Sequence, residues 1–235
     1  MREKSFAFYS DTGGRANNED FYLAKEIGEA HLFVVADGLG GHEAGEEASK
    51  IAVETIRNYM VDGDEKNLVE AIELANRAVL YRGKETARQM KTTVAAAFVE
   101  KDCTTIAHVG DTRVYAFNKC ATVFRTKDHS ASQLAVSVGE ISEAEIRGHE
   151  DRNILLRALG ASEKIKVDVV KLDNKSFDSL LLCSDGFWEY VLDEEMIQMQ
   201  SGVKTADSWL YKMRRAQLGR APDNCDNNTA VAVLI

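Results

Sequence analysis

The sequence predicts an α+β fold, with antiparallel sheets in the interior and helices on the outside. Short runs rich in Val, Phe, Leu and Thr dominate the chain, and each has the length of a normal strand between Gly, Asp or Asn residues. Several of these runs alternate apolar and polar residues, which favours antiparallel sheets over a buried parallel sheet. Two longer segments have helical periodicity, and strands interrupted by paired helices are typical of a layered α+β domain.

The expected elements follow from the spacing of apolar residues along the chain. Strands are predicted at 6–10, 32–36, 92–99, 104–109, 113–117, 167–172, 180–183 and 229–235. Apolar residues recur every three to four positions in 43–60 and 67–89, which predicts two long helices with one buried face each. Shorter helices are expected at 130–138, 142–149, 194–199 and 205–218.

Length and composition predict a single domain. A chain of 235 residues with 45% hydrophobic and 29% charged residues can bury a substantial core. Pro222 is its one proline, so no Pro-rich linker divides the sequence. We therefore expect one domain that spans residues 1–235.

The charge balance argues against a nucleic-acid partner. The chain has 29 Lys and Arg residues against 38 Asp and Glu residues, which gives a net charge of −9. Nucleic-acid backbones are bound through clustered basic residues, and this sequence has no long basic run. An acidic protein can still bind a phosphorylated substrate when bound metal ions reverse the local charge.

Cysteine usage and hydropathy bear on the compartment. The four cysteines are scattered without a Cys-x-x-Cys pair, so they predict neither a zinc site nor a disulfide framework. No apolar run approaches the roughly 18 residues that a membrane span needs. We expect a monomer in the cytoplasm with no membrane partner.

Three aspartates stand at the ends of predicted strands. Asp37 and Asp185 each follow a strand and precede a glycine, and Asp226 precedes the last strand. Carboxylates and backbone carbonyls are the ligands that Mg²⁺ and Mn²⁺ prefer, and we expect no thiolate or imidazole cluster to be available. Asp-Gly is also common turn chemistry, so any one of these sites alone is more simply explained as a turn.

Five ordered segments carry a resemblance to a known family. They are 10–20 (SDTGGRANNED), 35–42 (VADGLGGH), 110–113 (GDTR), 184–186 (SDG) and 226–229 (DNNT). In this order they resemble the motifs of the type-2C metal-dependent (PPM) Ser/Thr protein phosphatases, in the form of a bacterial-type bare catalytic domain. Further agreement comes from 127–130, 139–142 and 153–160, so the resemblance covers nearly the whole chain.

The resemblance implies a fold and a dinuclear metal centre. The fold is a four-layer α-β-β-α sandwich, in which helix pairs flank two antiparallel sheets and the metal centre lies at one end. Asp37 is expected to bridge two cations, Mn²⁺ or Mg²⁺, while the Gly38 carbonyl binds one of them. Asp185 and Asp226 are expected to complete the coordination of the other.

Further residues match family positions near the metals. Glu19 and Asp20 resemble acids that hold metal-bound waters. Asp111 resembles an acid that, with Asp185, recruits a third cation in bacterial-type members. Arg15 resembles the phosphate-binding arginine, whose guanidinium fork fits two phosphoryl oxygens, although a surface arginine in a glycine-rich loop is the alternative.

The resemblance also implies the reaction and leaves one proton unassigned. Two cations about 3.5–4 Å apart activate a water that attacks phosphorus in line, without a covalent intermediate. Many eukaryotic members have a histidine where this chain has Leu39, which cannot transfer a proton. The leaving oxygen is then protonated by metal-bound water or by another group such as His42, which alternatively belongs to the start of the following helix. We expect Arg113 to pair with a nearby acid and not to act in catalysis.

Segment 131–151 is polar and helical in pattern, and it lies between predicted strands. The resemblance identifies it as the flap, the variable part of the family beside the cleft, whereas a solvated helical hairpin is the simpler reading. Both descriptions hold if substrate preference is carried by a mobile surface element.

The predicted function is metal-dependent hydrolysis of phosphoserine and phosphothreonine in proteins, with the substrates of a Ser/Thr kinase as partners. One alternative is a pseudo-phosphatase that binds phosphoproteins without turnover, and loss of a metal aspartate would indicate it. Another is a regulatory phosphatase of the stress or sporulation type. A structural protein with accidental acidic turns is a third.

Overall fold

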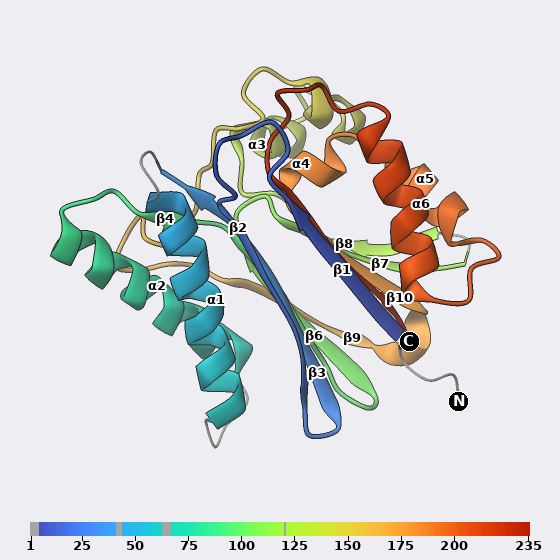
Figure 1. The fold of residues 1–235 in the computed structure, drawn as a ribbon, viewed down its shortest axis with the longest axis horizontal. Helices are drawn as coiled ribbons and strands as arrows, with labels where there is room; N and C mark the ends of the chain where they lie inside the picture. The colour runs from blue at the N-terminus through green and yellow to red at the C-terminus, as the bar shows by residue number, and fades with distance from the viewer. Residues whose placement is uncertain (1–4, 41–43, 63–66, 120) are drawn as a thin grey trace.

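Two antiparallel sheets stacked face to face form the interior of the protein (Figure 1). The computed structural model describes residues 5–40, 44–62, 67–119 and 121–235. The first sheet has the order β1 (Ser5–Asp11), β11 (Asn228–Leu234), β10 (Ser179–Cys183), β7 (Arg113–Asn118) and β8 (Ala121–Arg125). The second has the order β2 (Asp20–Ile27), β3 (Ala30–Leu39), β5 (Val94–Val99), β6 (Cys103–Val109) and β9 (Asp168–Asp173), and β4 (Lys91–Thr92) pairs with β3.

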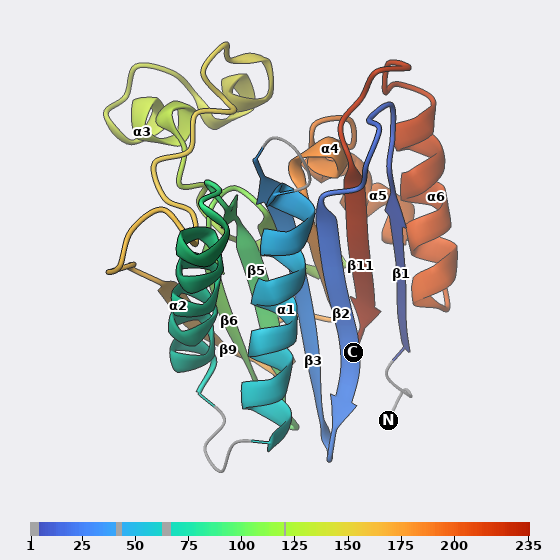
Figure 2. The same ribbon diagram turned by 60° about the vertical axis from the view of Figure 1, so that its left-hand side comes forward.

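Helices cover the outer face of each sheet. α1 (Ala44–Asp62) and α2 (Leu68–Thr86) pack on the second sheet, and α5 (Asp193–Gln200) and α6 (Ala206–Leu218) pack on the first (Figure 2). The remaining helical elements are α3 (Ala131–Ser137), η1 (Glu143–Gly148), η2 (Asn174–Ser176) and α4 (Asp185–Trp188). The expected four-layer α-β-β-α sandwich is confirmed.

The apolar run of β3 is explained by burial on both faces. Leu32 and Val34 point into the core under α1 and α2, whereas Phe33 and Val35 point between the two sheets. Successive side chains of a strand alternate between faces, so a strand covered on both sides reads as a continuous apolar segment. This packing fixes the end of β3, where Asp37 lies.

Most expected elements are found within a few residues, and the differences have local causes. β2 and β8 were not predicted, and both are edge strands in which most residues are only partly buried. The predicted strand 92–99 is divided between β4 and β5. The second long helix ends at Thr86 because Ala87 has left-handed backbone torsion, with φ of 54°. Segment 142–149 contains a 3₁₀ helix.

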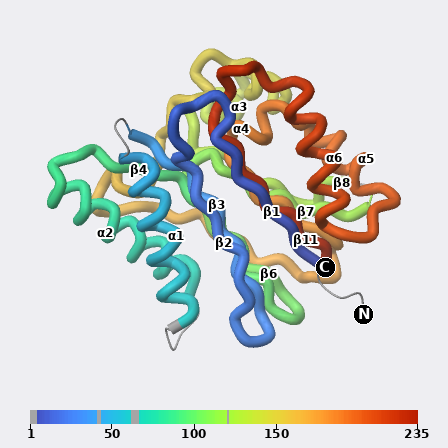
Figure 3. The backbone as a smooth tube through the Cα atoms, viewed as in Figure 1, coloured from blue at the N-terminus to red at the C-terminus, as the bar shows by residue number. Residues whose placement is uncertain are grey.

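The ends of several strands meet at one end of the sandwich. Asp20 at the start of β2 pairs with Asp37 near the end of β3, and Asp11 at the end of β1 pairs with Asn228 at the start of β11. The chain between β8 and β9, which contains α3 and η1, lies at this same end (Figure 3). Loops from both sheets can therefore contribute side chains to one site.

Candidate metal centre

A cavity of about 800 Å³ at this end of the sandwich collects most of the predicted site residues. Its predicted lining residues are Arg15, Glu19, Asp37, Gly38, Asp111, Asp185 and Asp226. They come from five segments that are separate in the sequence, and the fold brings these segments to one cavity. His42 falls within 41–43 and lies outside the described residues.

Asp37 is fixed through its main chain. Its backbone N–H donates to Thr93 Oγ1 at 3.0 Å, and its carbonyl accepts from the Thr92 hydroxyl and the Thr93 N–H, each at 2.8 Å. Burial raises the pKa of Asp37 well above its usual range, and the charges of Asp20 and Asp185 add to this effect. The neighbouring Gly38 is tightly packed, because a Cβ there would lie 2.0 Å from the Gly45 carbonyl oxygen.

Asp185 begins the short helix α4, directly after β10. The residue is partly exposed to the cavity, but its Oδ1 is shielded from solvent and has no hydrogen-bond partner. Burial raises the pKa of Asp185 to about 7, and the charges of Glu189 and Asp226 contribute. A carboxylate oxygen without a donor is the arrangement expected where a cation would supply the missing interaction.

Asp20 lies behind the cavity, and Glu19 lines it. The Ser184 hydroxyl donates to Asp20 Oδ2 at 2.7 Å, whereas Asp20 Oδ1 is buried without a partner. Burial raises the pKa of Asp20 to about 7. The Glu19 backbone N–H donates to Asn227 Oδ1 at 2.8 Å, and burial raises the pKa of the Glu19 carboxyl. Asp20 and Glu19 therefore lie where acids could hold metal-bound waters at the edge of a metal centre.

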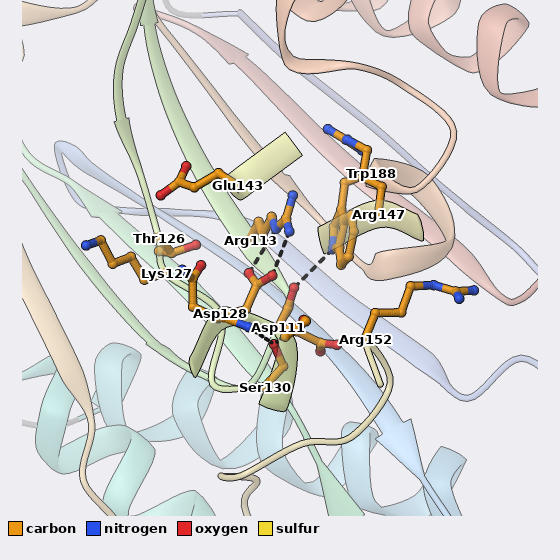
Figure 4. A network of polar contacts seen from close by, with 12 residues as sticks. Asp111, Arg113, Thr126, Lys127, Asp128, Ser130, Glu143, Arg147, Arg152 and Trp188 are labelled. Carbon is orange, nitrogen blue, oxygen red and sulfur yellow. Dashed lines mark hydrogen bonds and ion pairs between the residues drawn. The ribbon is translucent and has the colours of Figure 1, made fainter. Parts of the chain in front are cut away.

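Asp111 is held in the turn between β6 and β7 by a tryptophan (Figure 4). The Trp188 indole Nε1–H donates to the Asp111 carbonyl oxygen at 3.0 Å. Burial and the charge of Asp185 raise the pKa of Asp111 well above its usual range. Trp188 also ends α4, so one side chain links the two segments expected to hold a third cation.

Arg113 has the structural role that the sequence predicts. Its Nε and Nη2 donate to the two carboxylate oxygens of Asp128 at 2.9 and 2.6 Å, and both side chains are 1% exposed. The guanidinium stacks 3.5 Å above the Trp188 ring (Figure 4). Arg113 thus supports the tryptophan that positions Asp111.

Arg15 lies at the rim of the cavity, opposite in charge to its neighbours. Its Nη2 donates to Asp226 Oδ2 at 2.8 Å, and the two side chains are 56% and 43% exposed. An exposed pair of this kind is held weakly, so either partner can be recruited by a ligand. The contact places the predicted phosphate-binding residue beside a predicted metal ligand.

The donor set fits hard divalent cations. Glu19, Asp37, Asp111, Asp185 and Asp226 surround one cavity, and like charges in a shared site oppose ionisation of one another. Oxygen ligands of this type are those that Mg²⁺ and Mn²⁺ prefer. Asp37, Gly38, Asp185 and Asp226 are therefore suited to hold cations.

Sequence reasoning missed the residues that orient these acids. Thr93 holds Asp37, Ser184 holds Asp20, and Trp188 holds Asp111. Asn227 joins the loop before β2 to β11, because its amide also donates to the Thr12 and Asn17 carbonyls at 2.8 and 2.9 Å. Each partner is distant in sequence, so no local pattern signals it.

The expectation that the chain has no imidazole cluster is wrong. His108 and His129 stack with ring centroids 4.6 Å apart, and Asp168 lies beside them. Within the described ranges, they form the only group of three or more His, Cys, Asp or Glu residues whose ligand atoms all lie within 4.8 Å of one another. The Gly110 N–H donates to His129 Nδ1, so neutral His129 carries its proton on Nε2, 3.3 Å from Asp168 Oδ2. This Nε2–H faces the Asp168 carboxylate without forming a hydrogen bond, and because it carries the proton it is not available as a metal ligand.

The flap segment is connected to the rest of the protein by arginine-carboxylate pairs. Arg147 of η1 pairs with Asp193 at the start of α5, and Arg125 at the end of β8 pairs with Glu143 at 2.8 Å. Segment 131–151 contains α3 and η1 and adjoins the cavity through Asn153 and Leu155, which follow it. The assignment of 131–151 as the flap stays a prediction.

The fold and the acidic cavity define a metal-dependent protein phosphatase, and the chain belongs to the protein phosphatase 2C family. The family model described as protein phosphatase 2C matches residues 10–218. This finding confirms the family resemblance and the class of enzyme that the motifs predict.

Named relatives agree with this assignment. The chain is 35% identical over 205 residues to the serine/threonine phosphatase Stp of Listeria innocua, which covers 83% of this chain and 78% of the relative. The crystal structure of the serine/threonine phosphatase Stp1 from Staphylococcus aureus matches with a TM-score of 0.89 and 29% identity, over 100% of this chain and 95% of that one. The catalytic domain of PstP in complex with two manganese ions matches with a TM-score of 0.82 and 26% identity, over 98% and 97% of the two chains.

None of the helices in the described part of the chain is both long and apolar enough to cross a bilayer.

Proposed function

We propose that this protein removes phosphate from phosphoserine and phosphothreonine of other proteins in a reaction that needs two divalent cations, Mn²⁺ or Mg²⁺. The observation that carries the proposal is the single cavity that Asp37, Asp185 and Asp226 line together with Arg15. Family membership and the manganese complex of the related PstP support it. When bound, the cations supply a water nucleophile at neutral pH and neutralise charge on the phosphoryl group.

The chain's own residues bind and orient the reacting groups. Asp37, the Gly38 carbonyl, Asp185 and Asp226 hold the cations, and Glu19 and Asp20 orient water at the edge of the site. The main-chain contacts of Asp37 and the Ser184–Asp20 hydrogen bond keep these acids in place without substrate. Preorganised groups of this kind need no rearrangement as charge develops, which favours the transition state.

Arg15 binds the phosphoryl oxygens in this proposal. Its guanidinium has two parallel donors, and its exposed pairing with Asp226 can be exchanged for a phosphate at little cost. Asp111 supports a third, weaker cation together with Asp185, from the backbone position that Trp188 fixes. Leu39 lines the cavity and cannot donate a proton, so we propose that water protonates the leaving oxygen.

The proposal also covers the substrates, the oligomeric state, the location and the extent of the domain. We propose phosphoproteins that a Ser/Thr kinase modifies, a monomeric enzyme, no nucleic-acid partner and a cytoplasmic location. Cys103, Cys183 and Cys225 are free, which supports a reducing compartment. We propose residues 1–235 as one catalytic domain with 131–151 as its flap. The binding-only alternative has no support, because every expected metal aspartate is present in the cavity.

The proposal is tested by kinetics of matched variants in saturating Mn²⁺. Asp37→Asn and Asp226→Asn are expected to lose turnover of a phosphothreonine peptide while circular dichroism shows a native fold. Asp102→Asn makes the same chemical change at an exposed residue outside the cavity and should keep wild-type activity. Wild-type kcat in either cavity variant would refute the site assignment.

A further inference from the structure

A second cavity opens beside the acidic one, and Arg88 lines both. The second cavity has a volume of about 350 Å³ and lies between the C-terminal end of α2, β4 and residues 160–161. Its basic lining residues are Lys84, Arg88 and Lys91. The end of α2 and β4 lie at the same end of the molecule as the flap (Figures 1 and 2). The shared arginine joins a basic subsite to the acidic centre.

The backbone of Arg88 is fixed by a hydrogen bond, whereas its guanidinium makes only one long contact with a carboxylate. Its N–H donates to the Gly83 carbonyl at 3.0 Å, in the left-handed turn that ends α2. Its side chain is 48% exposed, and its Nη1 lies 4.0 Å from Glu47 Oε2. Arg82 already binds the other oxygen of Glu47 at 2.5 Å. Arg88 therefore keeps guanidinium donors available at the junction of the two cavities.

The ammonium groups of Lys84 and Lys91 are also not held by strong ion pairs. Lys91 is exposed on β4, and its backbone pairs with Leu39, which lines the acidic cavity. For the described residues, the ammonium of Lys91 forms no ion pair. Lys84 pairs with Glu163 at 3.1 Å, but these side chains are 70% and 81% exposed, so solvent screens the pair. The side chains of Lys84, Arg88 and Lys91 can therefore all bind an anionic ligand.

We infer that this second cavity binds an acidic or phosphorylated side chain that flanks the scissile phosphoresidue of the substrate. The inference rests on the proposed phosphatase function and specifies its substrate class as acidic phosphopeptide segments. A basic subsite is notable on a chain with net charge −9, because the protein as a whole repels such substrates. The guanidinium and ammonium groups at the rim attract anionic side chains locally. Because these groups lie apart from the acidic centre, one peptide can contact the basic cavity and the acidic centre at the same time.

The test compares three peptides that share one phosphothreonine. The first has neutral flanks, the second carries glutamates on both sides, and the third carries a phosphonate analogue of phosphoserine that the enzyme cannot hydrolyse. With wild-type protein and Mn²⁺, kcat/KM is expected to be roughly fivefold higher for the glutamate peptide than for the neutral one, as a few partly exposed charge pairs allow. This ratio should fall towards one at high salt, because screening weakens such pairs.

The variants assign the effect to the subsite. In the double variant Arg88→Gln with Lys91→Gln the ratio is expected to fall towards one for both anionic peptides. Lys175→Gln removes the same type of charge from exposed η2, outside both cavities, and should preserve the wild-type ratio. Circular dichroism confirms that each variant is folded.

The outcomes distinguish failure of the subsite from failure of the proposed phosphatase function. Hydrolysis of all peptides with a wild-type ratio near one, or a ratio that the double variant retains, overturns the subsite alone. A ratio that Lys175→Gln lowers equally shows a general charge effect and also overturns it. If no peptide is hydrolysed, the proposed function fails and the subsite fails with it.

Discussion

Replacing Asp185 by asparagine is expected to stabilise the protein when divalent cations are removed. Burial raises the pKa of this carboxyl from 3.8 to about 7, and Glu189 and Asp226 add to the shift. A carboxyl whose folded pKa is raised contributes stability below its unfolded pKa and loses it as pH rises through the folded pKa. The wild-type protein in chelator should therefore lose stability between about pH 4 and pH 7.

The size of the effect follows from this shift. Three pKa units correspond to about 4 kcal/mol, which is the upper limit for the cost of ionising Asp185 at pH 8. Because part of the residue faces the open cavity, solvent screening reduces the cost, and we expect a gain of about 2 kcal/mol for Asp185→Asn. The gain should be less than half as large at pH 5, where the wild-type carboxyl is mostly protonated in the folded state.

Urea unfolding in excess EDTA, followed by tryptophan fluorescence, measures this difference at pH 8 and pH 5. Asp102→Asn is the matched control and should leave the midpoint unchanged at both pH values. Saturating Mn²⁺ at pH 8 should reverse the order, because the wild-type protein gains binding free energy that the variant loses. An Asp185→Asn variant that is no more stable than wild type at pH 8, or equally stabilised at both pH values, would refute the reasoning.

Three further predictions concern residues around the centre. Arg15→Ala should mainly raise KM for a phosphopeptide, with a smaller fall in kcat, because a phosphate clamp binds the ground state as well as the transition state; an unchanged kcat/KM would make Arg15 a surface residue. Asp128→Asn should destabilise the fold by about 3 kcal/mol in urea unfolding, because it leaves the buried Arg113 guanidinium without its charge partner, and a loss below about 1 kcal/mol would contradict this. His42→Gln should cost less than tenfold in kcat and leave the pH profile in place, well below the roughly 10²–10⁴-fold loss of a general acid. A loss seen with a phosphoserine peptide but absent with an activated aryl phosphate would identify His42 as the proton donor.

The sequence singled out Asp37, Asp185 and Asp226, which the structure brings to one cavity, because their local setting is informative. Asp37 and Asp185 follow buried strands, and such strands can be recognised from a continuous apolar run. The order of the motifs then favours a metal site over ordinary Asp-Gly turns, and this assignment stays a prediction. Arg113 was also assigned correctly as a structural residue, although its partner Asp128 was not identified.

The unpredicted features depend on long-range packing. Thr93 contacts Asp37 across 56 residues, and Ser184 contacts Asp20 across 164 residues, so neither contact leaves a local pattern. The edge strand β2 was missed because its residues are mostly half-buried and show weak alternation. The helix α4 has only four residues, which is too short for a helical period to appear.

We propose that the acids of the cavity hold two cations and that turnover requires both. Metal-free protein is titrated with Mn²⁺ while bound manganese and phosphate release from a phosphothreonine peptide are measured in the same samples. We predict no release in chelator and a maximal rate once about two ions are bound per chain. Full turnover in chelator, or a rate that is independent of bound manganese, would contradict the account.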